Sequence, residues 1–153
     1  MTKIQIQQRL EFWLRAQTLE VNIVGPAELA VMLGNGSAAW QCRILCEDAP
    51  LTIHYLSRLP DRVPEHMISG LAIRLLDLNR GVRFGQFSLD SHRRTITFRL
   101  TQMLRTDCPL AAQFYEAMTL SHHIMITKGR ELARMIRQLD RTPRHRQGAF
   151  QCN

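Results

Sequence analysis

LPDRVPEHMISGLAIRLLDLNRGVRFGQFSLDSHRRTITFRL, residues 59–100, decides the fold because it contains a helix start, a helix, a helix end and two strands in succession. Pro64 fixes φ and lacks the N–H that a first helical turn leaves unpaired, and Glu65 suits the positive end of a helix. Apolar residues then recur at three- and four-residue spacing along one helical face: Met67, Ile68, Leu71, Ala72, Leu75, Leu76 and Leu78. We expect the helix to end near Asn79, because the sequence from Asn79 to Gly81 tolerates a left-handed turn.

The same stretch ends in a predicted β-hairpin. Residues 84–89 form a short aromatic segment, residues 90–92 are turn-formers, and apolar and polar residues alternate over 95–100. Such alternation places one face of a strand in the core. We therefore expect the helix and the hairpin to share one core, which contains Leu71, Leu75, Phe87, Ile96 and Phe98.

This order of elements resembles the bacterial YbjN family of sensory-transduction regulators, whose fold is similar to that of type III secretion chaperones. The resemblance is best over residues 56–100 and extends loosely over 5–139. It is carried by Leu59-Pro60, Val63-Pro64, Leu78-Asn79, Gly85, Phe87, Leu89-Asp90 and Phe98-Arg99. It implies a type III secretion chaperone-like architecture and a non-enzymatic role, because none of these residues is catalytic. Secretion chaperones of this fold tend to be acidic, whereas this chain has a formal net charge of +7.

The flanking segments extend the pattern on both sides. Residues 4–14 predict an amphipathic helix, and Gly25-Pro26 ends that region. Residues 20–33 are ambiguous, although 28–33 favour a strand because a strong turn cluster follows at 34–37. Alternation predicts strands over 39–46 and 51–59. Helical spacing over 110–139 predicts one long helix, or two short ones with a break between Thr119 and Gly129.

These elements predict one α+β domain over residues 1–140, with an antiparallel sheet of about five strands flanked by helices. A basic flexible tail should follow over residues 141–153. The glycine cluster at 34–37 favours a hairpin turn over a phosphate-binding loop, because it lacks the lysine and the spacing of such a loop. The sequence shows no charged-then-apolar leader and no long apolar run, so we expect no signal peptide, no membrane span and a cytoplasmic location.

Histidine and cysteine spacing disfavours a metal site. His122 and His123 are adjacent, so their side chains would diverge by about 100° on a helix. Two of the cysteines, four residues apart on one predicted strand, would lie about 13 Å apart and could not form a disulfide. The four cysteines match no zinc-ligand spacing: Cys42, Cys46, Cys108 and Cys152. We therefore predict no metal, no cofactor and no catalytic residue.

Positive charge is concentrated in the second half of the chain. Residues 79–153 contain 13 basic and 5 acidic residues, whereas residues 1–78 contain 7 and 8. Most of the basic side chains are arginines, whose planar fork binds carboxylate or phosphate in a bidentate manner. Six arginines in a predicted turn and helical row are candidate contacts for an anion or a partner: Arg93, Arg94, Arg130, Arg134, Arg137 and Arg141. A solvated basic surface would explain the same pattern.

Three classes of function follow, in descending order of support. The first is a small regulator or chaperone-like module that binds a polypeptide and forms a homodimer, with Leu10, Trp13 and Leu14 as the predicted dimer or partner face. The second is a nucleic-acid-binding regulator that uses the basic half, although no known nucleic-acid-binding motif supports it. An enzyme ranks last, because we can assemble no acid, base or nucleophile constellation from the sequence.

Overall fold

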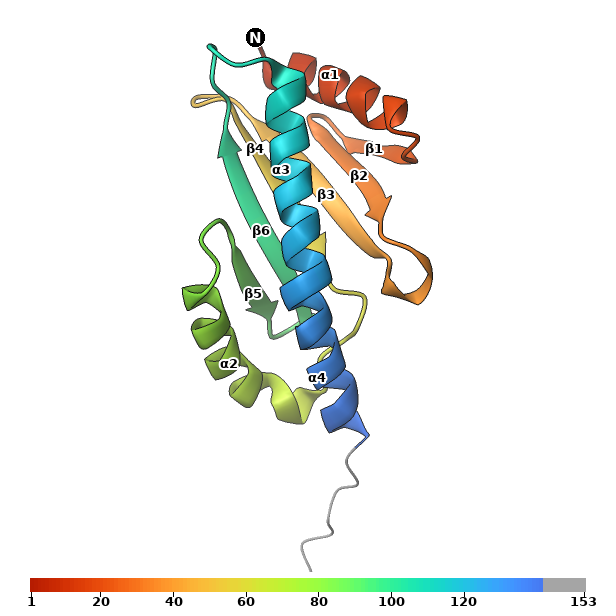
Figure 1. The fold of residues 1–153 in the computed structure, drawn as a ribbon, viewed down its shortest axis with the longest axis vertical. Coiled ribbons are helices and arrows are strands. Elements are labelled where there is room, and N and C mark those ends of the chain that lie inside the picture. The colour runs from red at the N-terminus through yellow and green to blue at the C-terminus, as the bar shows by residue number, and fades with distance from the viewer. Residues whose placement is uncertain (142–153) are drawn as a thin grey trace, which may run out of the picture.

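The computed structural model describes residues 1–141, which form an open six-stranded antiparallel sheet with helices on one face (Figure 1). The strand order is β1-β2-β3-β4-β6-β5. The strands are β1 (Val21–Gly25), β2 (Glu28–Leu33), β3 (Trp40–Glu47), β4 (Thr52–Arg58), β5 (Gln86–Asp90) and β6 (Thr95–Met103). The predicted α+β class and antiparallel sheet are confirmed. The sixth strand, β1, comes from the segment that the sequence left ambiguous. Residues 142–153, with most of the predicted basic tail, lie outside the described residues.

The helices precede, interrupt and follow the strands. They are α1 (Lys3–Ala16), α2 (Ile68–Arg80), α3 (Leu110–Ile124) and α4 (Arg130–Asp140), with short η1 (Gly36–Ala38) and η2 (Glu65–Met67). The predicted break between Thr119 and Gly129 is a π-helical turn, η3 (Met125–Gly129), through which α3 continues into α4. No helix within residues 1–141 is both long and apolar enough to span a membrane.

The boundaries of α2 agree only in part with the prediction. Pro64 precedes η2 with a φ of −60°, so the helical segment does begin where its ring predicts. The helix ends at Arg80, one residue beyond the predicted position. The expected left-handed turn is absent at this end, because Gly81 has a φ of −88°. Asn79 instead uses its side chain to bind β5.

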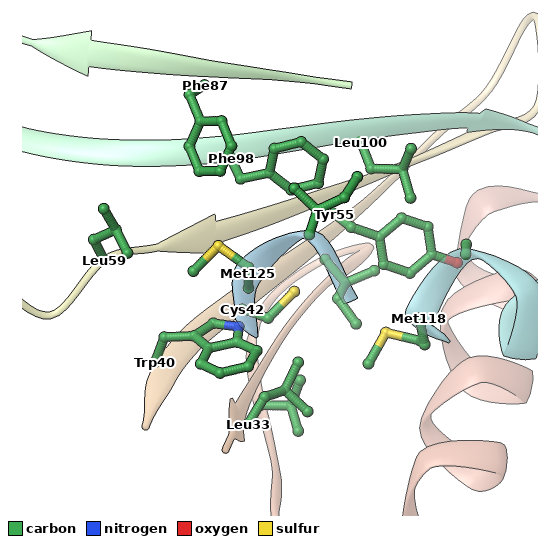
Figure 2. Packing of buried hydrophobic residues seen from close by; sticks show 14 of the residues in the cluster. Leu33, Trp40, Cys42, Tyr55, Leu59, Phe87, Phe98, Leu100, Met118 and Met125 are labelled. Atoms are coloured by element: carbon green, nitrogen blue, oxygen red, sulfur yellow. The ribbon is translucent and has the colours of Figure 1, made fainter. Parts of the chain in front are cut away.

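The core lies between the helices and one face of the sheet (Figure 2). Alternate residues of the central strands point into it, and Figure 2 shows Trp40, Cys42, Tyr55, Phe98 and Leu100 among them. All five predicted core residues of the α2–hairpin unit are buried, at 4% exposure or less. Their predicted burial in one core is therefore confirmed.

Candidate functional site

The face of the sheet opposite the helices is the candidate site. Because side chains alternate along a strand, the outward residues of β2, β3, β4 and β6 form one surface, which we call the open face. The strand register places on it Glu28, Ala30, Met32, Gln41, Arg43, Leu45, Glu47, Thr52, His54, Leu56, Arg58, Thr97, Arg99, Thr101 and Met103. None of the helices in residues 1–141 covers this surface, since α1 and α3 pack on the other face of the sheet.

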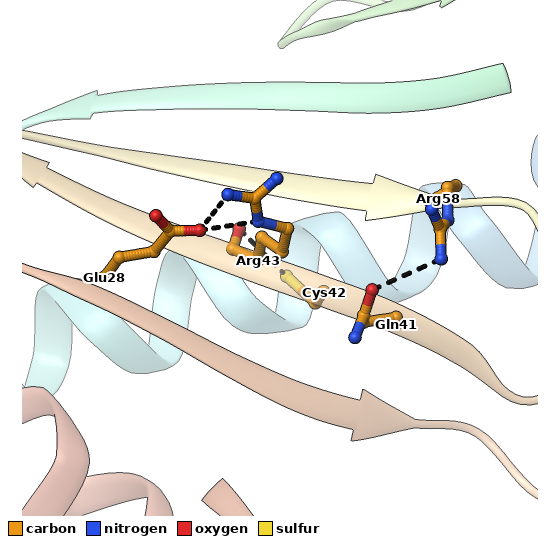
Figure 3. A network of polar contacts seen from close by, with 5 residues as sticks. All are labelled: Glu28, Gln41, Cys42, Arg43 and Arg58. Atoms are coloured by element: carbon orange, nitrogen blue, oxygen red, sulfur yellow. Dashed lines mark hydrogen bonds and ion pairs between the residues drawn. The ribbon is translucent and has the colours of Figure 1, made fainter. Parts of the chain in front are cut away.

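Three exposed arginines give the open face its charge. Arg43 pairs with Glu28 on the neighbouring strand, and Figure 3 shows this contact on the sheet surface with the helix behind. Arg58 reaches only the side-chain oxygen of Gln41, at 3.4 Å. Arg58 and Arg99 form no ion pair with a carboxylate among the described residues. The face therefore keeps two guanidinium groups available to an external anion.

His54 connects several of these polar side chains. Its Nδ1 lies 2.9 Å from the Thr101 hydroxyl and 3.2 Å from Arg99 Nη2. A guanidinium can only donate, so a hydrogen bond from Arg99 requires Nδ1 to be the accepting nitrogen of the ring. Nε2 lies 3.1 Å from Glu47 Oε2 but is not aligned for a hydrogen bond. The contacts with Thr101 and Arg99 position the imidazole, whereas Nε2 and Glu47 lack the alignment of a hydrogen bond.

Apolar side chains separate the charged ones. Leu56 lies between Arg43 and Arg99 in one row across three strands. Leu45 and Leu56 are half-buried, whereas Met32 and Met103 at opposite corners are 51% and 64% exposed. Such a surface can bind a partner that offers both carboxylates and apolar side chains.

The thiols beneath the open face are not nucleophiles. Cys42 and Cys46 point into the core from β3, and burial raises the pKa of each to about 11. Burial also raises the pKa of Tyr55, which donates a hydrogen bond to Gln102 at 3.2 Å. These groups stay protonated near neutral pH, so they act as packing residues.

The six arginines predicted from the sequence fall into two groups that meet at one end of the molecule. Arg93 and Arg94 lie in the β5–β6 turn. Of the other four, three lie within α4 and Arg141 caps its C-terminal end. The loop after β4 joins the groups: Val63 N donates to Arg94 O at 2.8 Å, and Asp61 accepts two bonds of 3.1 Å from Arg137. Asp61 therefore neutralises Arg137, which is no longer a free anion contact.

The predicted partner face on the first helix needs correction. Leu10 and Leu14 are fully buried, because α1 packs this apolar side onto its own sheet. Trp13 is partly buried, and its ring meets Phe114 of α3 edge-on at 6.0 Å. These side chains hold α1 in the core and do not form a free surface. The exposed large apolar residues of α1 are instead Ile4, at 49%, and Phe12, at 79%.

Among residues 1–141, no three His, Cys, Asp or Glu side chains lie close enough together to hold a metal ion. His122 instead packs its ring on Trp40, with centroids 5.3 Å apart. The cysteines at 42, 46 and 108 are free thiols.

Sequence reasoning missed the open face, although a signal for it was present. The alternation in residues 39–46 and 51–59 that buried Cys42 and Ile44 also placed Arg43 and Leu45 together on the other side. The sequence could not show which side the helices would leave uncovered.

A scan against models of protein families and a search of curated proteins found no match to this chain.

Proposed function

We propose that this protein is a non-enzymatic regulator or chaperone-like module that binds a polypeptide partner on the open face of its sheet. The observation that carries the proposal is the uncovered surface on which Arg58 and Arg99 alternate with Leu56 and Met103. A polypeptide with acidic and apolar residues would satisfy both kinds of side chain. A nucleic acid would find no exposed aromatic ring among the open-face residues on which to stack a base.

Three further observations support this proposal. The order of a first helix, strands, α2, the β5–β6 hairpin and a final helix supports a YbjN-like, type III secretion chaperone-like fold. Arg58 and Arg99, which form no ion pair with a carboxylate of residues 1–141, favour an acidic partner. The free thiols of Cys42, Cys46 and Cys108 are consistent with a reducing cytoplasm as its location.

We place the homodimer interface of this proposal on α2. Ile73 and Leu76 are 65% and 67% exposed on its outward side, although Leu71 and Leu75 already anchor the helix in the core. Gly70 lies on the same exposed side, and a Cβ there would meet no atom within 4 Å. A glycine in an exposed helix is otherwise unfavourable by about 1 kcal/mol. These features suit the close approach of a second α2.

The alternative function, nucleic-acid binding, rests on α4. Arg130 and Arg134 are exposed on this helix and have no ion-pair partner in the part of the chain that the structure describes. Arg141 follows them at the helix end. A row of this kind can neutralise phosphates without reading base sequence.

One pair of matched variants separates the two functions. Arg58→Glu/Arg99→Glu reverses charge on the open face, and Arg130→Glu/Arg134→Glu makes the same change on α4. Each protein is titrated by fluorescence anisotropy against a labelled copolymer of glutamate and valine and against a random DNA duplex. We expect the open-face variant to lose copolymer binding and the α4 variant to retain it. Tight duplex binding that only the α4 variant loses, without copolymer binding by the wild type, would establish the nucleic-acid function instead.

A further inference from the structure

Part of strand β6 has no neighbour on one side. β4 pairs with β6 as far as Met103, whereas β5 pairs with it only as far as Arg99. Ile96 O accepts from Leu59 N and Leu104 N donates to Leu51 O, so even-numbered residues direct their backbone groups toward β4. The backbone N–H and C=O groups of Thr101 and Met103 therefore point to an edge where residues 1–141 provide no strand. We call Thr101–Met103 the free edge.

Gly85 immediately precedes the first residue of β5 and lies very close to β6. It has a φ of +81°, and a Cβ there would lie 2.5 Å from Arg99 O, so only glycine can pass this close to β6. The chain turns away from the sheet at this residue. The two outer edges are protected by contrast, because β1 carries a register shift after Ile23 and β5 is bound by Asn79.

A cavity of about 280 Å³ lies beside the free edge, between β6 and α3. Phe84 and Leu120 contribute apolar side chains to its wall, and Phe84 is 60% exposed. Arg105 lines the cavity at one end of the free edge, and Arg99 lies at the other end on the open face. Glu116 in the lining and the nearby Asp107 offset the charge of Arg105, so Arg99 on the open face is the cation that would attract an acidic segment.

We propose that the free edge accepts an extended acidic segment of the polypeptide partner as an added strand, collinear with β5. This inference rests on the proposed function and specifies how the partner binds. Alternate apolar residues of the segment would enter the cavity against Phe84 and Leu120. The acidic residues between them would lie on the open face near Arg99, and their backbone groups would pair with Thr101 and Met103.

The probes are short labelled peptides in which valine and glutamate alternate, with a lysine-for-glutamate peptide as the charge control. In the proposed register the residues opposite Thr101 and Met103 are the glutamates, as Gln86 is opposite Arg99. Methylation of the glutamate backbone nitrogens should weaken binding by about tenfold for each hydrogen bond lost. Methylation of the valine nitrogens should leave the affinity within about threefold of the parent peptide. The lysine peptide should not bind.

A protein variant tests the backbone N–H that β6 would donate to the peptide. Met103→Pro removes an N–H that points to the free edge and leaves the β4 ladder intact, whereas Met103→Val keeps the N–H. We expect only the proline variant to lose affinity, and its urea midpoint shows whether it has folded. Amide exchange at Thr101 and Met103 should slow when the wild type binds the peptide.

Each result leads to a different conclusion. Peptide binding that needs Arg58 and Arg99 but is indifferent to glutamate methylation would overturn the added strand and leave the proposed polypeptide-binding function standing. Binding of neither the peptide nor the copolymer would overturn both. Slow exchange at Thr101 and Met103 in the peptide-free protein, together with a concentration-dependent mass, would assign the free edge to a second copy of this chain and overturn the inference.

Discussion

Asn79 holds Phe87 with both atoms of its side-chain amide. Asn79 Oδ1 accepts from Phe87 N at 2.8 Å, and Asn79 Nδ2 donates to Phe87 O at 2.9 Å. These are the two bonds that an antiparallel neighbour would make to Phe87. The last turn of α2 therefore closes the outer edge of β5 as a short strand would.

Asn79→Ala should lower the free energy of unfolding by about 1 to 3 kcal/mol, because it removes both partly buried hydrogen bonds. The measurement is urea denaturation followed by circular dichroism. Asn35→Ala, in the exposed loop before η1, is the control, because Asn35 makes no capping bond with its side chain. Equal effects of the two changes would show that the Asn79 bonds contribute nothing.

Two glycine-to-alanine changes should have opposite effects. Gly85→Ala should destabilise the protein by more than about 1 kcal/mol, because the residue has a positive φ and the new Cβ would meet Arg99 O and the Phe98 ring. At concentrations where the protein is monomeric, Gly70→Ala should stabilise it by about 0.5 to 1 kcal/mol, because this helical position is open in the single chain. Thermal denaturation measures both. A neutral Gly85→Ala variant would contradict the close approach of Gly85 to β6.

The two faces of β6 should differ in their tolerance of truncation. Phe98 is fully buried and packs on Phe87 with ring centroids 5.0 Å apart, whereas Thr97 is half-buried on the open face. Phe98→Ala should therefore cost about 3 to 5 kcal/mol of stability. Thr97→Ala should change it by less than about 1 kcal/mol. Equal shifts in the urea midpoint would mean that the strand register is wrong.

Stability should fall in alkaline solution. The thiols of Cys42 and Cys46 have an ordinary pKa of 9.0 that the fold raises to about 11. Below about pH 9 both thiols are protonated in the folded and the unfolded protein, so they do not change the free energy of unfolding with pH. Between about pH 9 and 11 the thiols ionise freely only in the unfolded chain, which favours unfolding. The free energy of unfolding should then decrease by up to about 1.4 kcal/mol per pH unit for each thiol. A Cys42→Ala/Cys46→Ala variant, whatever its absolute stability, should show a shallower slope in urea titrations over this range, and an unchanged slope would contradict the assignment.

A homodimer that forms through α2 should depend on the exposed apolar side chains of that helix. Leu76→Glu places a charge on the exposed side of α2 and should convert a dimer to a monomer, as measured by light scattering after size exclusion. Trp13→Ala should lower stability through the lost contact with Phe114 but leave the mass unchanged. A wild-type mass that is monomeric at all micromolar concentrations would refute the homodimer itself.

Local periodicity made most elements predictable. The spacing in residues 64–80 and the alternation in residues 95–100 each depend on neighbours within a few positions, so α2 and β6 could be placed from the sequence. β1 escaped prediction because it is short and three of its five residues are exposed, which gives no clean alternation. The left-handed turn expected near Asn79 failed for a different reason. Asn79 does have a structural role there, but its partner is Phe87 on the next strand.

The sequence by itself determined the α+β class, the helix–hairpin core and the excess of positive charge, because these follow from composition and from short-range spacing. Only the tertiary structure decided that Leu10 and Leu14 are buried, that Asp61 neutralises Arg137, and that one sheet face and the edge at Thr101 stay open. Those outcomes depend on pairings between distant segments, such as His54 with Thr101 across β4 and β6. An amphipathic segment shows that it has a face to bury, but only the packed neighbours show which surface remains for a partner.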